Sequence, residues 1–123
     1  MKWVYSAQVG SRPLKAMTYK SITCIELRDW LATGERPVLL DVREDEEREI
    51  STISGDVHIP MNDVPFRVDE LDPQKPIVVY CKGGVRSARI AEFLVAKGFP
   101  DVTNLEGGIN EWARSVDQSL PVY

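Results

Sequence analysis

The segment that most constrains the fold is IVVYCKGGVRSARIAEFL, from Ile77 to Leu94. Three β-branched residues and a tyrosine lead into Cys81, a glycine pair follows, and a helical pattern of apolar residues then begins. This order predicts a buried strand, a tight loop and a covering helix. A strand that is apolar on both faces is typical of a parallel sheet, because helices cover both sides of such a sheet.

The same alternation continues along the chain. Further strands are predicted at 37–42, 57–59 and 102–105, and helices between Thr23 and Gly34, at 62–71, at 86–97 and after Gly107-Gly108. Strands that alternate with helices in a short chain indicate an α/β domain with a mostly parallel sheet. The 123 residues leave room for one such domain. We expect residues 1–20 to form a flexible extension or interdomain linker, and residues 21–123 to form the domain.

Composition narrows the function classes. The formal net charge of −4 argues against a chain built to hold nucleic acid. No apolar run approaches the ~20 residues of a membrane-spanning helix, and the first twenty residues carry no secretory signal pattern. Two cysteines, Cys24 and Cys81, and one histidine, His58, suggest neither a disulfide framework nor a zinc site. We therefore expect a cytoplasmic protein with a free thiol and no metal.

Cys81 is the candidate catalytic residue, because it stands where a predicted parallel strand ends. Functional groups gather outside the carboxyl ends of such strands. The glycines after it allow successive N–H groups to turn inward as an anion-binding nest, and the next helix directs its free N–H groups and positive dipole end into the same space. The candidate loop consists of Lys82, Gly83, Gly84, Val85, Arg86 and Ser87.

The loop and the helix start around Cys81 predict a low thiol pKa for this residue. The loop amides and the positive charges of Lys82 and Arg86 favour the thiolate over the thiol, and Ser87 can add a hydroxyl as helix N-cap or as a donor to the loop. The same cradle would hold an anionic substrate. The alternative is a buried cysteine that merely closes a strand, which accounts for neither the glycine pair nor the cations.

Several short motifs, in this order, resemble the rhodanese-type sulfurtransferase domain. After the capped first helix they are LLDVRE (39–44), SGDVHIP (54–60), VVYCKGGVRS (78–87) and NLEGGINEW (104–112). The resemblance implies an α/β fold with a central, mostly parallel five-stranded sheet and helices on both faces. It also implies sulfur transfer through a persulfide on Cys81, from thiosulfate or a protein persulfide to a nucleophilic acceptor, without a cofactor.

The final segment INEWARSVDQSLPVY is similar to the end of rhodanese domains fused C-terminally to ubiquitin-activating-like adenylating enzymes. Those enzymes serve molybdopterin, thiamine or thiouridine sulfur pathways. The likeness implies that a ubiquitin-like sulfur-carrier protein is a candidate acceptor.

Charged residues near the expected site have candidate roles in binding or in support of the loop. Arg86 can bind substrate oxygens or pair with a carboxylate that braces the loop. Asp41 and Arg43, from the DVR motif, are expected to support the site, Asp41 by bonding loop amides and Arg43 by pairing with an acid. The acidic run 44–49 could dock a basic partner, and solvated surface is the favoured reading.

Three further features are expected to be structural. His58 lies between apolar neighbours and is expected to be a hydrogen-bonded structural histidine. Cys24, in the first turn of a capped helix, could have a lowered pKa and resolve a persulfide, but packing is the favoured role. The Gly107-Gly108 pair is expected to make a tight turn that lets Trp112 pack.

Two other functions remain open from the sequence. Arsenate reductases and cell-cycle phosphatases use a related loop with five residues between cysteine and arginine, whereas four separate Cys81 from Arg86. The shorter loop makes a smaller cradle, better matched to one sulfur than to a phosphate. A non-catalytic binding module is the other alternative, and the intact cysteine loop argues against it.

Overall fold

The computed structural model describes residues 18–123. The expected extension, residues 1–20, lies outside this range except for its last three residues. The elements in chain order are β1 (Lys20–Ile22), α1 (Cys24–Ala32), β2 (Val38–Asp41), α2 (Asp45–Arg48), β3 (Val57–His58), η2 (Met61–Asp63), α3 (Val64–Arg67), η3 (Val68–Glu70), β4 (Ile77–Tyr80), α4 (Val85–Ala96), β5 (Val102–Leu105) and α5 (Gly108–Ser115).

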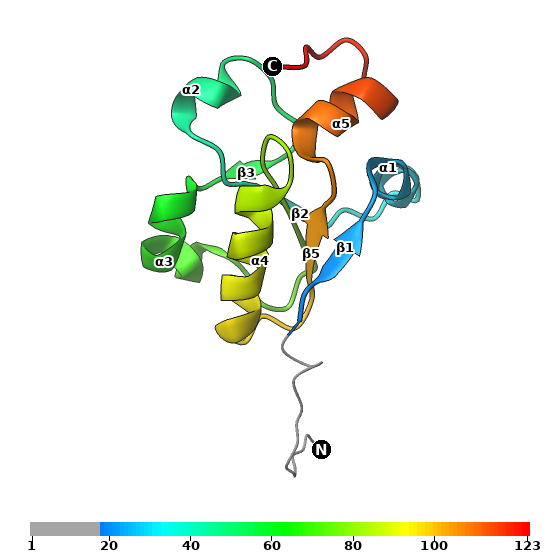
Figure 1. Cartoon of the computed structure of the whole chain (residues 1–123). Coiled ribbons are helices and arrows are strands. Elements are labelled where there is room, and N and C mark those ends of the chain that lie inside the picture. The colour runs from blue at the N-terminus through cyan, green and yellow to red at the C-terminus, as the bar shows by residue number, and fades with distance from the viewer. Residues whose placement is uncertain (1–17) are drawn as a thin grey trace.

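The five strands form one sheet in the order β1-β5-β4-β2-β3, and every pairing is parallel (Figure 1). β4 lies at the centre and all four of its residues are buried. The prediction of a five-stranded parallel sheet is therefore confirmed. β1 was not predicted, because three residues with one apolar side chain are too short to display a strand period.

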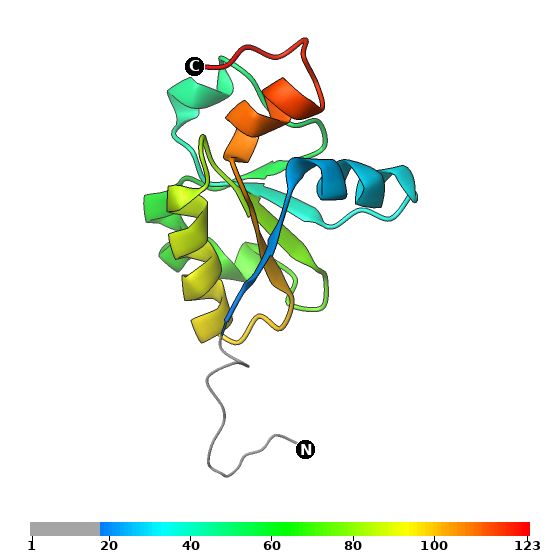
Figure 2. The same cartoon turned by 45° about the vertical axis from the view of Figure 1, so that its right-hand side comes forward.

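Helices cover both faces of the sheet, as expected (Figures 1 and 2). Ile77 and Val79 point into one core with α3 and α4, while Val78 and Tyr80 point into a second core with α1 and α5. This alternation follows from the two-residue period of a strand. The parallel strands have apolar residues on both faces because both faces are buried.

A local sequence signal, the capping box, sets the start of α1. Thr23 caps α1 and accepts a hydrogen bond from the Glu26 amide at 3.1 Å, while the Glu26 side chain accepts one from the Thr23 amide at 2.9 Å. The predicted helix 62–71 is instead three short helical segments. Pro65 explains part of this break, since it lacks an N–H with which to continue a helix from η2.

The topology places the loop after β2 and the loop after β4 side by side at the carboxyl edge of the sheet. From β2 the chain continues outward to β3, whereas from β4 it continues in the opposite direction to β5. Ligand sites of open α/β sheets form at such switch points. Among residues 18–123, no helix has the length and apolar character needed to cross a membrane.

Candidate active site

Cys81 follows β4 directly, and its sulfur faces the start of α4. The Sγ atom accepts hydrogen bonds from the Gly84 amide at 3.1 Å and the Ser87 amide at 3.4 Å, and it lies 3.3 Å from Ser87 Oγ. Gly84 is the N-cap of α4 and has a φ of 105°, a backbone conformation that residues other than glycine rarely adopt. Of the two roles predicted for Ser87, the N-cap is therefore wrong, and its hydroxyl contacts the sulfur.

Opposing effects set the pKa of Cys81. Burial raises the pKa, since the residue is only 1% exposed. Hydrogen bonds from the hydroxyl and amide of Ser87 and from the amides of Gly84 and Gly83 lower it more, so that the pKa lies below its ordinary value. The lowered pKa of Cys81 agrees with the sequence-based expectation, and its causes are uncharged hydrogen-bond donors in the loop.

The start of α5 holds the cysteine loop from the other side. The Ile109 amide donates to the Cys81 carbonyl at 2.9 Å and the Asn110 amide donates to the Lys82 carbonyl at 3.2 Å. A Cβ atom on Gly108 would lie 2.5 Å from the Cys81 carbonyl oxygen. Gly108 therefore allows a close approach between two backbones, a role beyond the predicted tight turn.

Asn104, on β5, fixes the same loop at a second point. Its side-chain amide donates to the Gly84 carbonyl at 3.2 Å. Gly84 is thus held at its carbonyl oxygen by Asn104, while its amide donates to Cys81 Sγ. Sequence reasoning did not find this contact, because it joins residues 20 positions apart.

Arg86 pairs with a carboxylate from α2. Its Nη1 and Nη2 atoms donate to Glu47 Oε1 and Oε2 at 2.7 and 2.9 Å. Of the two predicted roles of Arg86, the structure contains the bracing one. The bonds from Arg86, with those from the Glu44 amide and the Tyr123 hydroxyl, outweigh burial and lower the pKa of Glu47 to about 2. Glu47 belongs to the acidic run that was expected to be solvated, and for this residue that expectation is wrong.

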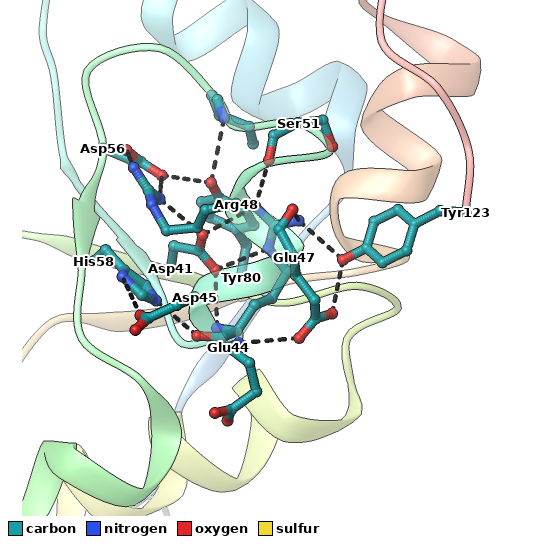
Figure 3. A network of polar contacts seen from close by, with 12 residues as sticks. Asp41, Glu44, Asp45, Glu47, Arg48, Ser51, Asp56, His58, Tyr80 and Tyr123 are labelled. Carbon is teal, nitrogen blue, oxygen red and sulfur yellow. Dashed lines mark hydrogen bonds and ion pairs between the residues drawn. The ribbon is translucent and has the colours of Figure 1, made fainter.

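Tyr123 lies beside this pair, because the segment after α5 runs back towards α2 (Figure 1). Its hydroxyl donates to Glu47 Oε2 at 2.7 Å and accepts from Arg43 Nη1 at 2.9 Å (Figure 3). The Asn110 side chain bonds both the Tyr123 amide and carbonyl at 3.1 Å. Lys82 Nζ lies 5.0 Å from the centre of the Tyr123 ring, within reach of a cation–π interaction.

Asp41, the last residue of β2, forms a buried pair with Arg43. Asp41 accepts from the Arg43 amide at 2.9 Å and from Nε and Nη2 of Arg43, both at 3.0 Å. Arg43 also donates to the Ser51 carbonyl at 2.6 Å. Neither charge of this pair is exposed, so the pair holds the loop after β2 in place. Asp41 bonds the amide of its own loop, and Arg43 pairs with an acid, as expected.

His58 and Cys24 have structural surroundings. A ring nitrogen of His58 lies 2.7 Å from the Arg43 carbonyl, in keeping with a structural histidine. Cys24 is 2% exposed, and burial together with the charge of Glu111 raises its pKa to about 12. Its side chain belongs to the core under α1 and α5, whereas Cys81 belongs to the other core. The lowered pKa considered for Cys24 is therefore wrong, and its surroundings are those of a packed side chain.

Comparisons with known proteins agree with this geometry. The family model described as "Rhodanese-like domain" matches residues 23–115. The chain is 38% identical over 96 residues to "Putative sulfurtransferase YtwF" of Bacillus subtilis, covering 78% of this chain and 92% of that protein. It is 37% identical over 117 residues to "Probable adenylyltransferase/sulfurtransferase MoeZ" of Mycobacterium tuberculosis, covering 94% of this chain but only 30% of MoeZ.

The fold has matches among solved structures as well. A crystal structure of a rhodanese-like domain protein from Staphylococcus aureus superposes with a TM-score of 0.74 at 36% sequence identity, covering 85% of this chain and 98% of that one. The family model spans the elements from α1 to α5, including the cysteine loop and the turn that supports it. The chain therefore belongs to the rhodanese-like family of sulfurtransferase-related domains.

Proposed function

We propose that the chain is a rhodanese-type sulfurtransferase that carries sulfur as a persulfide on Cys81. The observation that carries the proposal is the ring of donors from Gly84 and Ser87 around Cys81 Sγ. These donors favour a thiolate, which is the nucleophilic form of cysteine. The sulfurtransferase names of YtwF and MoeZ support the same reaction class.

The proposed reaction has two steps. In the first, the Cys81 thiolate attacks the outer sulfur of thiosulfate, giving Cys81–S–S⁻ and sulfite, or of a persulfide R–S–S⁻, giving Cys81–S–S⁻ and R–S⁻. In the second, an acceptor thiolate or cyanide attacks the outer sulfur and releases the Cys81 thiolate. The loop amides that donate to Sγ are suited to stabilise the negative charge of the persulfide intermediate.

The burial of Cys81 favours a sulfur donor over a phosphate. With 1% of the residue exposed, a substrate has to present a single protruding atom beside the exposed residues Lys82 and Gly83. The outer sulfur of thiosulfate or of a persulfide meets this requirement. Arg86, the residue that would clamp a phosphate, is occupied by Glu47. We expect no Cys81-dependent hydrolysis of p-nitrophenyl phosphate.

The proposed acceptor is a thiol, which attacks the outer sulfur of Cys81–S–S⁻ and releases the Cys81 thiolate. A ubiquitin-like sulfur carrier whose C-terminus is activated as an acyl adenylate is the other candidate; there the persulfide attacks the carbonyl and releases AMP, and a second thiol reduces the resulting acyl disulfide. The match to MoeZ, which pairs adenylyltransferase and sulfurtransferase in its name, supports a carrier. Mixing persulfidated protein with candidate acceptors, followed by intact mass measurement of both partners, tests this step. With a thiol acceptor, the expected result is loss of the sulfur from Cys81 with an equal gain on the acceptor; with an adenylated carrier, it is a covalent adduct between carrier and chain that a thiol reductant resolves.

Intact mass spectrometry tests the first step. Incubation with thiosulfate or cysteine persulfide should add one sulfur, ~32 Da, to the wild-type chain. The gain should disappear in Cys81→Ser and persist in Cys24→Ser, which serves as the matched control because both cysteines are buried. A chain that gains no mass from either donor would favour the binding-module alternative.

A further inference from the structure

Glu47 is built into the rim of the cysteine loop as a fixed negative charge. Its two carboxylate oxygens receive four donors, two from Arg86, one from the Glu44 amide at 3.0 Å and one from the Tyr123 hydroxyl. Only 17% of the side chain is exposed. Figure 3 shows the carboxylate between Glu44 and Tyr123. With its pKa lowered to about 2, this group is ionised at neutral pH.

The charge of Glu47 offsets one of the two cations of the loop. The loop 82–87 contains Lys82 and Arg86. Arg86 directs both terminal nitrogens of its guanidinium at Glu47, so the pair has no net charge. Lys82 extends over the Tyr123 ring on the exposed side. The loop and its carboxylate partner therefore present one net positive charge to an incoming donor.

Sulfur donors differ in how much positive charge they require. Thiosulfate carries two negative charges, and the thiolate of Cys81 adds a third when the two sulfurs meet. A persulfide R–S–S⁻ carries one charge at its reacting end. Because like charges at short range repel, the loss of one cation weakens the approach of thiosulfate more than that of a persulfide.

We infer that Glu47 is a specificity-determining residue, which withholds the charge of Arg86 from the site and so favours persulfide donors over thiosulfate. This inference rests on the proposed function. Thiosulfate loading remains balanced as Cys81–S⁻ plus S–SO₃²⁻ giving Cys81–S–S⁻ plus SO₃²⁻. Persulfide loading is Cys81–S⁻ plus R–S–S⁻ giving Cys81–S–S⁻ plus R–S⁻. Glu47 takes part in neither bond change.

The surroundings of Glu47 prevent it from swinging away when a donor approaches. Tyr123 links the carboxylate to the buried guanidinium of Arg43, since its hydroxyl bonds both groups. Asn110 holds the backbone of Tyr123 at both its amide and its carbonyl. A carboxylate fixed by charged and backbone donors competes with a substrate anion for Arg86 more effectively than a freely rotating one.

The test compares two donors on variants that remove the same charge from different places. Glu47→Gln removes the carboxylate that holds Arg86, and Glu46→Gln removes an exposed carboxylate from the same helix. The rate of Cys81 loading from thiosulfate and from cysteine persulfide is followed by intact mass after acid quench. We expect Glu47→Gln to load from thiosulfate about tenfold faster, the order of effect of one charge at short range.

The same variant should load from cysteine persulfide within about twofold of wild type, and Glu46→Gln should change neither rate, since exposed charges are screened by salt. Glu47→Ala is a second neutral replacement that carries the test if the glutamine variant does not fold. Adding Arg86→Gln to Glu47→Gln should remove the gain, because the freed guanidinium is its source.

Two results would overturn the inference. One is thiosulfate loading no faster than wild type in both folded Glu47 variants. The other is a thiosulfate gain that survives the loss of Arg86. Either can occur while wild type loads normally from persulfide, in which case the proposed function stands. If wild type loads from neither donor, the proposed function fails and the inference fails with it.

Discussion

Replacing Gly108 with alanine tests how the cysteine loop is held. The new Cβ would lie 2.5 Å from the Cys81 carbonyl oxygen and equally close to the Lys82 carbonyl carbon, and the residue has a φ of +61°. Real Cβ atoms do not approach other atoms so closely, and the atoms in question are backbone. The loop and the start of α5 therefore have to separate.

The magnitude follows from three contributions. The left-handed backbone costs an alanine about 1 kcal/mol, overpacking costs about 1–3 kcal/mol, and weakening the bonds from the Ile109 and Asn110 amides costs about 1 kcal/mol. These overlap, and we expect a loss of about 3–4 kcal/mol in the free energy of unfolding. Gly34→Ala is the matched control, because Gly34 has a φ of +90° and no atom within 4 Å of its added Cβ. It should lose only about 1 kcal/mol.

Urea unfolding measures the stability, and the rate of Cys81 loading at pH 7 measures the loop. Gly108→Ala should load at least about fivefold more slowly, since its loop amides move away from Cys81 Sγ, while Gly34→Ala should load at the wild-type rate. If Gly108→Ala is as stable as Gly34→Ala and loads at the wild-type rate, close approach of α5 does not shape the loop.

Three further outcomes are expected. Ser87→Ala should raise the pKa of Cys81 towards its ordinary value, because the hydroxyl 3.3 Å from Sγ is lost; the pH dependence of alkylation measures this, and an unchanged profile would contradict it. Arg43→Met should lower the free energy of unfolding by about 2–3 kcal/mol, less than the ~3–5 kcal/mol for a buried charge with no partner, since the buried Asp41 carboxylate keeps its ion pair with Arg48 at 2.8 Å; urea unfolding with wild-type stability would refute that role. The pKa of Glu47 is lowered from 4.5 to about 2, so its contribution to stability is present above pH 4.5 and lost as the pH falls towards 2. The melting temperature of Glu47→Gln should therefore fall less than that of wild type over this pH range, and an equal fall in both proteins would count against the Arg86 pairing.

The amino-acid sequence by itself determined the parallel α/β architecture, the capped start of α1 and the position of Cys81 between β4 and α4. These features are local, because strand and helix periods, the capping box and the glycine pair are each encoded in a few consecutive residues. The expectation of an anion-binding loop is local for the same reason. It needs only a strand end, two glycines and a helix start within one short segment.

Only the tertiary structure decided which groups meet around that loop. Arg86 and Glu47 are 39 positions apart, and Glu47 and Tyr123 are 76 apart. Gly108 reaches the Cys81 carbonyl because β4 and β5 are neighbours in the sheet. Such pairings depend on strand order and on the path of the chain after α5, which no contiguous pattern encodes. The charge available to a substrate at the cysteine loop is therefore a property of the folded chain.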